Sequence, residues 1–433
     1  MYSDLLFFVR LYAKFTVEFV EKRRGYGMKK SGILPNLKET FLDGKNYKIL
    51  LLSILATGLS YGLYKGMLDN YLSEIVNLGE MDRGVAEFFR EIPGVMLVLI
   101  LALFYMLSAE TLYKAGAVFL LAGMGMMAIL PPGKVLVVLS ITMYSLGEHI
   151  QIGMKNTLSL KYARTGHGGA ALGAQNSASQ IGTLVGYIAV VFAFSILAGG
   201  EGTYKLFFAI AAVLAAISAF MSFGITGKSE TDSNKRRFYF HKKYTKYYML
   251  EMFYGARKQV FFTFGPYVLI RVYDADAAKI SLLFAISAVT CFVASPIVGK
   301  IIDRIGYKAV MVADTLLLVI VCFFYGFAHH IFPHDVASVV CCVAYILDSI
   351  ISLASMASNI YVQDLADNQD EVKATISTGV SINHLITIFI ALCGGWIWQV
   401  LGIELLFILS AVLGLCNSAY AATIKTKRKA VNE

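Results

Sequence analysis

Five basic side chains lie in stretches that are otherwise apolar enough to cross a membrane: Lys65, Arg90, Lys155, Arg257 and Lys258. A charged group at the depth of the hydrocarbon is costly, and it is retained where it faces water, a counter-charge or a ligand. These residues therefore predict an internal polar path. Ammonium and guanidinium groups on such a path can bind a carboxylate or a phosphate, and arginine can do so through two parallel hydrogen bonds.

Acidic and imidazole side chains occur at similar depths, namely Asp348, Glu148, His149 and His384. A carboxyl group in an apolar place favours its neutral form and a nearby cation reverses this preference, so such a group can take up and release a proton. Histidine titrates near neutral pH and can do the same. We predict proton coupling through these four residues. A permanent salt bridge of Asp348, purely hydrogen-bonding histidines, and coupling to sodium are the alternatives.

The elements that carry these residues are predicted to be membrane helices. The chain has 433 residues, of which 57% are hydrophobic and 15% charged. Apolar runs recur at about the 20 residues that a helix needs to cross a bilayer. Helices are expected because backbone groups in lipid need internal partners. Twelve spans follow, at residues 47–71, 84–107, 113–131, 134–160, 169–199, 203–225, 245–271, 278–299, 308–329, 335–362, 372–398 and 402–424.

Lysine and arginine indicate the orientation of these spans. Most of those outside the spans fall in segments that share one side of the membrane. The positive-inside rule makes that side the cytoplasm, so we expect a multi-pass protein of the plasma (inner) membrane with both termini cytoplasmic. The predicted divisions are a cytoplasmic segment at 1–46 that includes an amphipathic helix, a six-helix bundle at 47–225, a cytoplasmic linker at 226–244, a second bundle at 245–424 and a cytoplasmic tail at 425–433.

An internal duplication supports two halves. Tyr61–Lys65 matches Tyr254–Lys258, and Tyr113–Ala115 matches Tyr307–Ala309 at almost the same spacing. Two six-span halves arranged as a parallel repeat predict a binding site near the midplane, at their interface. Lys65 and Lys258 are equivalent in this repeat, so they are expected to approach the central axis from opposite halves. Two such cations would suit an anionic solute.

Polar residues at helical spacing indicate which spans line the site. Tyr144, Glu148, Gln151 and Lys155 lie on one face of the fourth span, and Tyr345, Asp348 and Asn359 on one face of the tenth. The alternative for Lys65 is an ion pair with Asp69 one turn onward, and for Lys258 an ion pair with Glu251. The predicted substrate-binding residues are Lys65, Lys258, Arg257, Gln151, Tyr144, Tyr345, Asn359 and Gln180.

One loop resembles a family signature. Gly299–Lys308, which reads Gly-Lys-Ile-Ile-Asp-Arg-Ile-Gly-Tyr-Lys, is similar to the loop motif of the major facilitator superfamily. The resemblance implies an all-α integral membrane fold, with twelve transmembrane helices in two pseudo-symmetric six-helix bundles. It also implies a cytoplasmic gate that holds helix ends together in one conformation. The corresponding loop of the first half, Ser108–Lys114, lacks the Asp-Arg pair. The gating residues carried over are Gly299, Asp303, Arg304, Gly306 and Lys308.

Other classes of protein are disfavoured. The chain contains no HExxH, GxSxG or Walker A motif, so an enzyme is not expected. The net charge of +9 is explained by basic residues at the inner face of a membrane, so no nucleic acid is expected. The six cysteines show no metal-ligand spacing, and His329, His330 and His334 are expected to form a solvated turn. We therefore expect no cofactor and no metal.

The sequence thus predicts a secondary active transporter that moves a small, anionic organic solute by alternating access. Its predicted partners are that solute, H⁺ as the coupling ion and membrane lipids, and the protein is expected to be a monomer. Two alternatives stay open: a polyspecific drug–proton antiporter, and a sensor that has a transporter fold without transport.

Overall fold

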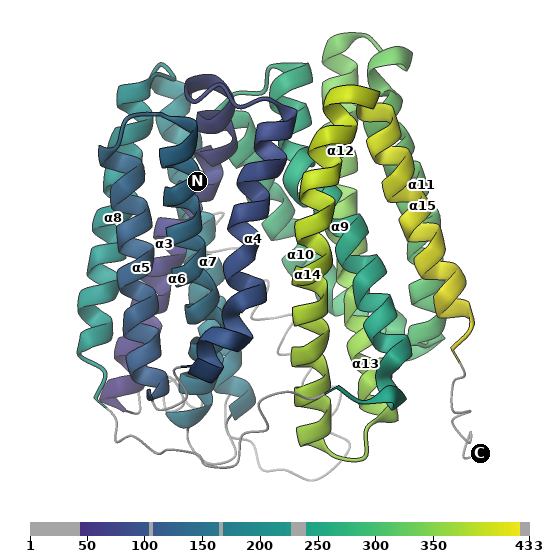
Figure 1. The fold of residues 1–433 in the computed structure, drawn as a ribbon, viewed down its shortest axis with the longest axis horizontal. Helices are drawn as coiled ribbons and strands as arrows, with labels where there is room; N and C mark the ends of the chain where they lie inside the picture. The colour runs from purple at the N-terminus through teal and green to yellow at the C-terminus, as the bar shows by residue number, and fades with distance from the viewer. Residues whose placement is uncertain (1–43, 104–106, 164–167, 227–239, 425–433) are drawn as a thin grey trace, which may run out of the picture.

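The computed structural model describes residues 44–103, 107–163, 168–226 and 240–424. This part of the chain is almost entirely helical (Figure 1). The predicted N-terminal amphipathic segment, most of the predicted linker and the tail at 425–433 lie outside the described residues.

The first half contributes six membrane-length segments. These are α3 (Lys45–Asn70) continued by the π-helical turn η1 (Tyr71–Ile75), α4 (Glu80–Leu103), α5 (Ala109–Ile129), α6 (Lys134–Lys161), α7 (Gly168–Ile196) and α8 (Glu201–Phe223).

The second half repeats the pattern. The 3-10 turn η2 (Lys242–Tyr244) leads into α9 (Thr245–Tyr273), followed by α10 (Ala277–Ile305), α11 (Tyr307–Ile331), α12 (His334–Ile351) continued by η3 (Ser352–Ser355) and α13 (Met356–Leu365), α14 (Gln369–Leu401) and α15 (Ile403–Ala422). The twelve predicted spans and the all-α class are therefore confirmed, with ends that differ by a few residues.

Local signals explain where several helices begin and end. Asp276 caps α10 by accepting a hydrogen bond from the backbone N–H of Lys279 at 2.8 Å, and Asn368 caps α14 in the same way through Glu371 at 2.9 Å. Gly306 separates α10 from α11 with a φ of 86°, a conformation that glycine adopts at no steric cost. The short turns keep consecutive helices antiparallel.

The surface of the described part confirms a membrane protein. Ten of its helices are long and apolar enough to span a bilayer; α4 and α9 are not among them. Large apolar side chains point outward, such as Phe220 of α8, which is 83% exposed. Such a surface suits lipid contact and not water. The protein is therefore a multi-pass integral membrane protein.

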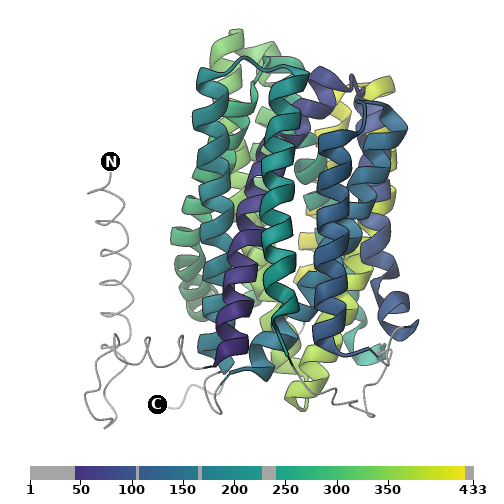
Figure 2. The same cartoon turned by 90° about the vertical axis from the view of Figure 1, so that its left-hand side faces the viewer.

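The two halves stand side by side in Figure 1, with α3–α8 on the left and α9–α15 on the right. They pack against each other mainly through two pairs of helices, α4 with α14 and α7 with α10, and α3 also contacts α9 and α10. Within the first half, α3 crosses α7 where Gly62 and Gly186 bring the two backbones together. Figure 2 shows α3 running obliquely beside α8.

The two ends of the helices are named here by their turns. The linker side, at the bottom of Figure 1, is where α3 and α9 begin and where α8 and α15 end. The far side carries the turns at residues 76–79, 130–133, 274–276 and 332–333.

Candidate functional site

A cavity of about 440 Å³ lies between the two halves. It is lined by α3, α5, α6 and α7 of the first half and by α10 and α12 of the second. Its α3 residues run from Ile54 to Tyr61, on the linker side of Lys65. The polar lining residues are Thr57, Tyr61, Tyr113, Tyr144, Glu148, Gln151, Lys155, Asn176, Ser179, Gln180, Thr183, Tyr187, Ser287, Tyr345 and Ser349. The fold thus brings together the predicted residues Tyr144, Gln151, Gln180, Tyr345 and Glu148.

Lys155 is the basic residue on the wall of this cavity. Among the described residues it has no hydrogen bond and no carboxylate within ion-pair distance. Glu148, on the same wall, lies 3.8 Å from the guanidinium of Arg90. Gln151 is buried, and its amide nitrogen has no partner within the described chain. The cavity therefore offers an unpaired ammonium group and a free amide donor to whatever enters it.

Beyond the cavity, toward the far side, six charged side chains form one buried network. Arg83 of α4 joins the two helices involved, because it contacts Asp69 of α3 at 3.0 Å and Glu87 at 2.9 Å. We call this set the charge network; it comprises Lys65, Asp69, Arg83, Glu87, Arg90 and Glu91.

The charge network is bonded to the second half. The side chain of Gln259 in α9 donates to Glu87 at 3.0 Å. In α14, His384 Nδ1 lies 2.7 Å from Glu91 Oε2, and the Thr387 hydroxyl donates to the same oxygen at 3.0 Å. These bonds hold the two halves together above the cavity.

Further bonds between the halves lie nearer the far-side turns. The Tyr267 hydroxyl of α9 donates to the carbonyl of Leu78 at 2.5 Å, and the Asn70 amide donates to the carbonyl of Ala275 at 2.8 Å. These bonds between the halves, together with those of the charge network, lie from mid-helix to the far side. The far side is therefore closed in this structure.

Lys65 lies in the charge network and not on the cavity wall. Its ammonium group is 2.9 Å from Asp69 and lies over the rings of Phe262 and Phe284 at 5.1 and 5.3 Å. The pairing with Asp69 that the sequence offered as the alternative is present. The full charge of Lys65 is thus already compensated within α3.

The basic pair of α9 points in two directions. Arg257 is buried inside the second bundle, where it contacts Asp314 of α11 at 3.1 Å and stacks on the Tyr254 ring at 5.0 Å. Lys258 is exposed, with no hydrogen bond or ion pair recorded in the described residues. Asp348 is buried, and its Oδ1 has no partner within them.

Three other predicted residues lie apart from the cavity lining. Asn359 is exposed on α13. His149 is buried on α6, with Nδ1 2.9 Å from the carbonyl of Ser145. Its ring centre is 5.0 Å from that of His384 on α14, so these two histidines meet across the boundary between the halves.

The predicted gating motif forms the linker-side turn between α10 and α11. Gly299 lies in the last turns of α10, Gly306 forms the turn, and Lys308 donates to the carbonyl of Ile424 at 2.9 Å. Asp303 and Arg304 are exposed, without a recorded hydrogen bond or ion pair in the described chain. In the first half, Glu110 instead contacts Lys161 at 2.9 Å.

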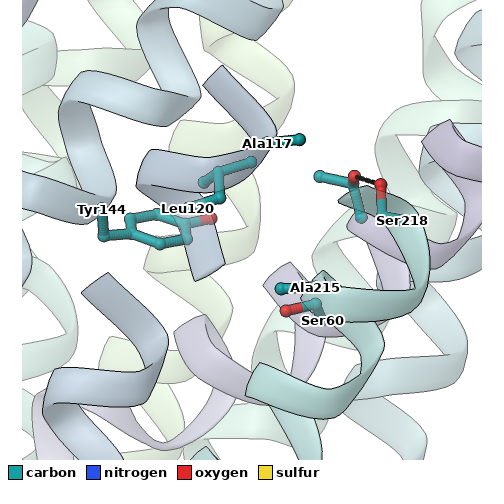
Figure 3. A pocket seen from close by; sticks show the side chains of 7 residues that line it. Ser60, Ala117, Leu120, Tyr144, Ala215 and Ser218 are labelled. Carbon is teal, nitrogen blue, oxygen red and sulfur yellow. Dashed lines mark hydrogen bonds between the residues drawn. The ribbon is translucent and has the colours of Figure 1, made fainter. Parts of the chain in front are cut away.

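A second, smaller pocket lies inside the first bundle (Figure 3). Its polar groups bond to the protein itself: the Thr57 and Ser218 hydroxyls are 2.7 Å apart, and Ser60 donates to the carbonyl of Ala211 at 2.8 Å. This pocket is therefore a packing defect between α3, α5, α6 and α8 and offers little to a ligand.

Sequence reasoning missed Arg83. The second span was predicted to begin after it, at residue 84, so Arg83 counted as a loop residue. The structure places it inside α4, 2% exposed, between two carboxylates. The available signal was the spacing of Arg83, Glu87 and Glu91, which puts all three on one helical face.

Comparisons with known proteins agree with this architecture. Residues 247–432 match the family model described as Major Facilitator Superfamily. No curated protein is detectably similar in sequence. Many solved structures have similar folds. One is the nucleoside transporter NupG (TM-score 0.69, 15% identity, covering 89% of this chain and 100% of that one). Another is a D-xylose–proton symporter (TM-score 0.68, 14% identity, covering 87% of this chain and 96% of that one).

A third is a bacterial homologue of the iron transporter ferroportin in an inward-facing state (TM-score 0.71, 12% identity, covering 90% of this chain and 99% of that one). The match to the Major Facilitator Superfamily model covers the C-terminal part of the chain, residues 247–432. Nearly the whole chain is similar in fold to these solved transporter structures.

Proposed function

We propose that the protein is a secondary active transporter that moves a small organic solute with an anionic group across the plasma membrane. It works by alternating access, in which the two halves rock about a central site. The observation that carries this proposal is the cavity between the halves: both halves line it, and bonds between them close its far side. We propose that the termini are cytoplasmic, which makes the linker side cytoplasmic and the structure an inward-facing state.

Lys155 is the reason for proposing that the substrate carries a negative charge. An ammonium group on a cavity wall without a protein partner is stabilised by an anionic ligand, because such a ligand compensates its charge. Gln151, Gln180, Tyr144 and Tyr345 supply hydrogen bonds around it. Lys258 is the second basic residue proposed to attract the anion. Lys65 and Arg257 are proposed to act indirectly, since each already pairs with an aspartate.

Asp348 is the residue proposed to carry the coupling proton. It is buried with one oxygen unpartnered in the described chain, and Arg257 and Lys258 are the cations that act on it. A carboxyl group whose cationic neighbour moves or binds substrate takes up a proton in exchange. Glu148, His149 and His384, the other residues predicted for this role, lie beside the charge network, and their part in coupling stays a prediction.

The gating motif would act in the opposite state. Asp303 and Arg304 are exposed on the linker side, which is the side that must close when the far side opens. We propose that they then bond to the first half by charge-assisted hydrogen bonds.

The test begins with a thermal-shift screen of the purified protein against organic anions, zwitterions and neutral solutes. A hit is then measured in proteoliposomes, where a carrier accelerates exchange when unlabelled substrate is present inside. We expect Lys155→Gln to weaken binding of an anionic hit by about 10–100-fold. Lys205→Gln, which removes a lipid-side ion pair with Glu201, is the matched control. Binding without exchange would contradict a carrier, and a screen with only neutral or cationic hits would contradict the substrate class.

A further inference from the structure

Three potential metal ligands meet where the two halves join. Glu91 of α4, His149 of α6 and His384 of α14 each offer one ligand atom, and these atoms lie within 4.8 Å of one another. The sequence spacing gives no sign of this cluster, because its members are far apart in the chain and come from both halves.

His149 is already held as a metal-binding histidine is. Its Nδ1 lies 2.9 Å from the carbonyl oxygen of Ser145, which can only accept a hydrogen bond, so Nδ1 carries the proton. In the neutral ring Nε2 then presents its lone pair. The side chain is 6% exposed, and Nε2 has no recorded hydrogen bond within the described residues. A backbone carbonyl that fixes the ring in this way is the usual outer partner of a histidine ligand.

Space for an ion lies beside both rings. A Cβ atom added to Gly94 would stand 2.6 Å from His149 Nε2 and 3.0 Å from His384 Nδ1. Glycine keeps this point empty. Metal–nitrogen bonds are about 2.0–2.1 Å long, so small side-chain rotations bring the ligands onto one ion. Metal ligands must be deprotonated, so the ion replaces the proton that His384 and Glu91 now share.

The local charge also favours a cation. The charge network contains three basic residues, and its carboxylates together with Glu148 number four. With His384 neutral, one negative charge is therefore uncompensated among these directly contacting groups. Lys155 lies further along the cavity wall and outside contact distance. A buried ion in such surroundings is stable when its ligands and neighbours balance its charge.

We propose that Glu91, His149 and His384 bind one divalent first-row transition-metal ion, with Zn²⁺ as the representative. Two imidazoles and a carboxylate suit such ions and not Mg²⁺ or Ca²⁺, which prefer oxygen ligands. Two ligands belong to the first half and one to the second, so the ion binds only while the far side is closed. Binding therefore shifts the protein toward this closed arrangement.

The experiment uses full-length protein that carries His329→Gln and His330→Gln. These two residues meet Glu404 at the far side, where His330 Nε2 lies 2.8 Å from Glu404 Oε1, and they are the other described group that could hold a metal. Zn²⁺ binding is followed by thermal shift, and Co²⁺ binding by its absorption spectrum. We expect about one ion per chain. His149→Gln and His384→Gln should each abolish binding, and the exposed His334→Gln should leave it unchanged.

The histidine variants could lose metal binding because they fail to fold, so a conservative variant provides a second test. Thr387→Val keeps the volume of the side chain and removes the hydroxyl, which lies 3.0 Å from Glu91 Oε2 and 2.9 Å from the carbonyl oxygen of His384. We expect it to lower the metal affinity by about 10–100-fold. Hydrogen exchange of the far-side turn at 274–276 tests the conformational part: Zn²⁺ should slow it in the background protein and not in His384→Gln. Absence of Zn²⁺ binding, binding that survives both histidine variants, or exchange that Zn²⁺ does not slow would each overturn the proposal.

Discussion

The carboxylate of Asp69 lies 2.9 Å from the ammonium group of Lys65, one turn earlier on α3, and compensates its charge. The internal repeat predicts instead that Lys65 faces the substrate. The equivalent position in the second half, one turn after Lys258, is Phe262. The ring of Phe262 lies against Lys65 instead. Equivalent lysines of the two halves therefore have different neighbours. Lys65 pairs with Asp69 and lies over two rings of the second half, whereas Lys258 is exposed.

Asp69 should matter more for stability than Lys65. Asp69→Asn leaves Lys65 without a carboxylate and weakens the hold on Arg83, whereas Lys65→Met leaves Asp69 paired with Arg83. We expect Asp69→Asn to lower the free energy of unfolding by about 3–5 kcal/mol, the cost of breaking a buried ion pair, and Lys65→Met to cost clearly less. Denaturant unfolding in detergent measures both. Equal losses would contradict the network described for Asp69.

Tyr267 should control closure of the far side. Tyr267→Phe removes one hydrogen bond between the halves, worth about 1 kcal/mol, and so should raise the open population about five-fold. Tyr325→Phe is the control, because its hydroxyl donates to the carbonyl of Gly265 at 2.9 Å inside one half. Hydrogen exchange of the turn at 76–79 should accelerate in the first variant and not in the second. The same acceleration in both would mean that general loosening is responsible.

Gly186 should tolerate no side chain where α3 crosses α7. A Cβ atom there would lie 2.7 Å from the Cα of Gly62. We expect Gly186→Ala to destabilise the protein by about 1–3 kcal/mol through overpacking. Gly173→Ala, on the same helix with nothing within 4 Å of its new Cβ, should be neutral or stabilise by up to about 1 kcal/mol. The melting temperatures of the two variants test this prediction. Similar melting temperatures would contradict the close approach of α3 and α7 at Gly186.

Asp348 should be required for coupling and not for folding. We expect Asp348→Asn, which keeps the shape of the side chain, to abolish uptake driven by an imposed pH gradient while the melting temperature stays near that of the unmodified protein. Asp335→Asn is the control, because Asp335 lies on the same helix in an exposed position. Uptake is measured in proteoliposomes with the substrate that the screen identifies. Retained gradient-driven uptake in Asp348→Asn would remove this residue from the coupling step.

Most of the fold could be predicted from the sequence, because membrane helices are recognisable by their length and their low polarity. Each of the twelve spans was predicted within a few residues, including α4 and α9, whose charges lower their mean hydropathy. The polar faces of α6 and α12 were also readable, since one helix carries its own periodicity. Tyr144, Glu148 and Gln151 on the first, and Tyr345 on the second, line the cavity.

Contacts between helices were not readable in this way. Nothing in the chain links Glu91 to His384, which are 293 residues apart. Arg83 was misplaced because a hydropathy window counts its charge without seeing the two carboxylates that compensate it. The direction of Arg257 depended on Asp314 of another helix. Side-chain partners are a property of packing, and one sequence contains that information only indirectly.

The polarity of α4 and α9 has a consequence for biogenesis. Because of their charges, we expect these two segments to leave the translocon for lipid less readily than the other ten. For α4 the counter-charge is available immediately, because Asp69 of the preceding helix can pair with Arg83. Helices α3 and α4 can therefore enter the bilayer together as a helical hairpin. For α9 the counter-charge is synthesised later, because Asp314, which pairs with Arg257, lies two helices downstream on α11. We therefore expect full integration of the second bundle to require that α11 has been synthesised.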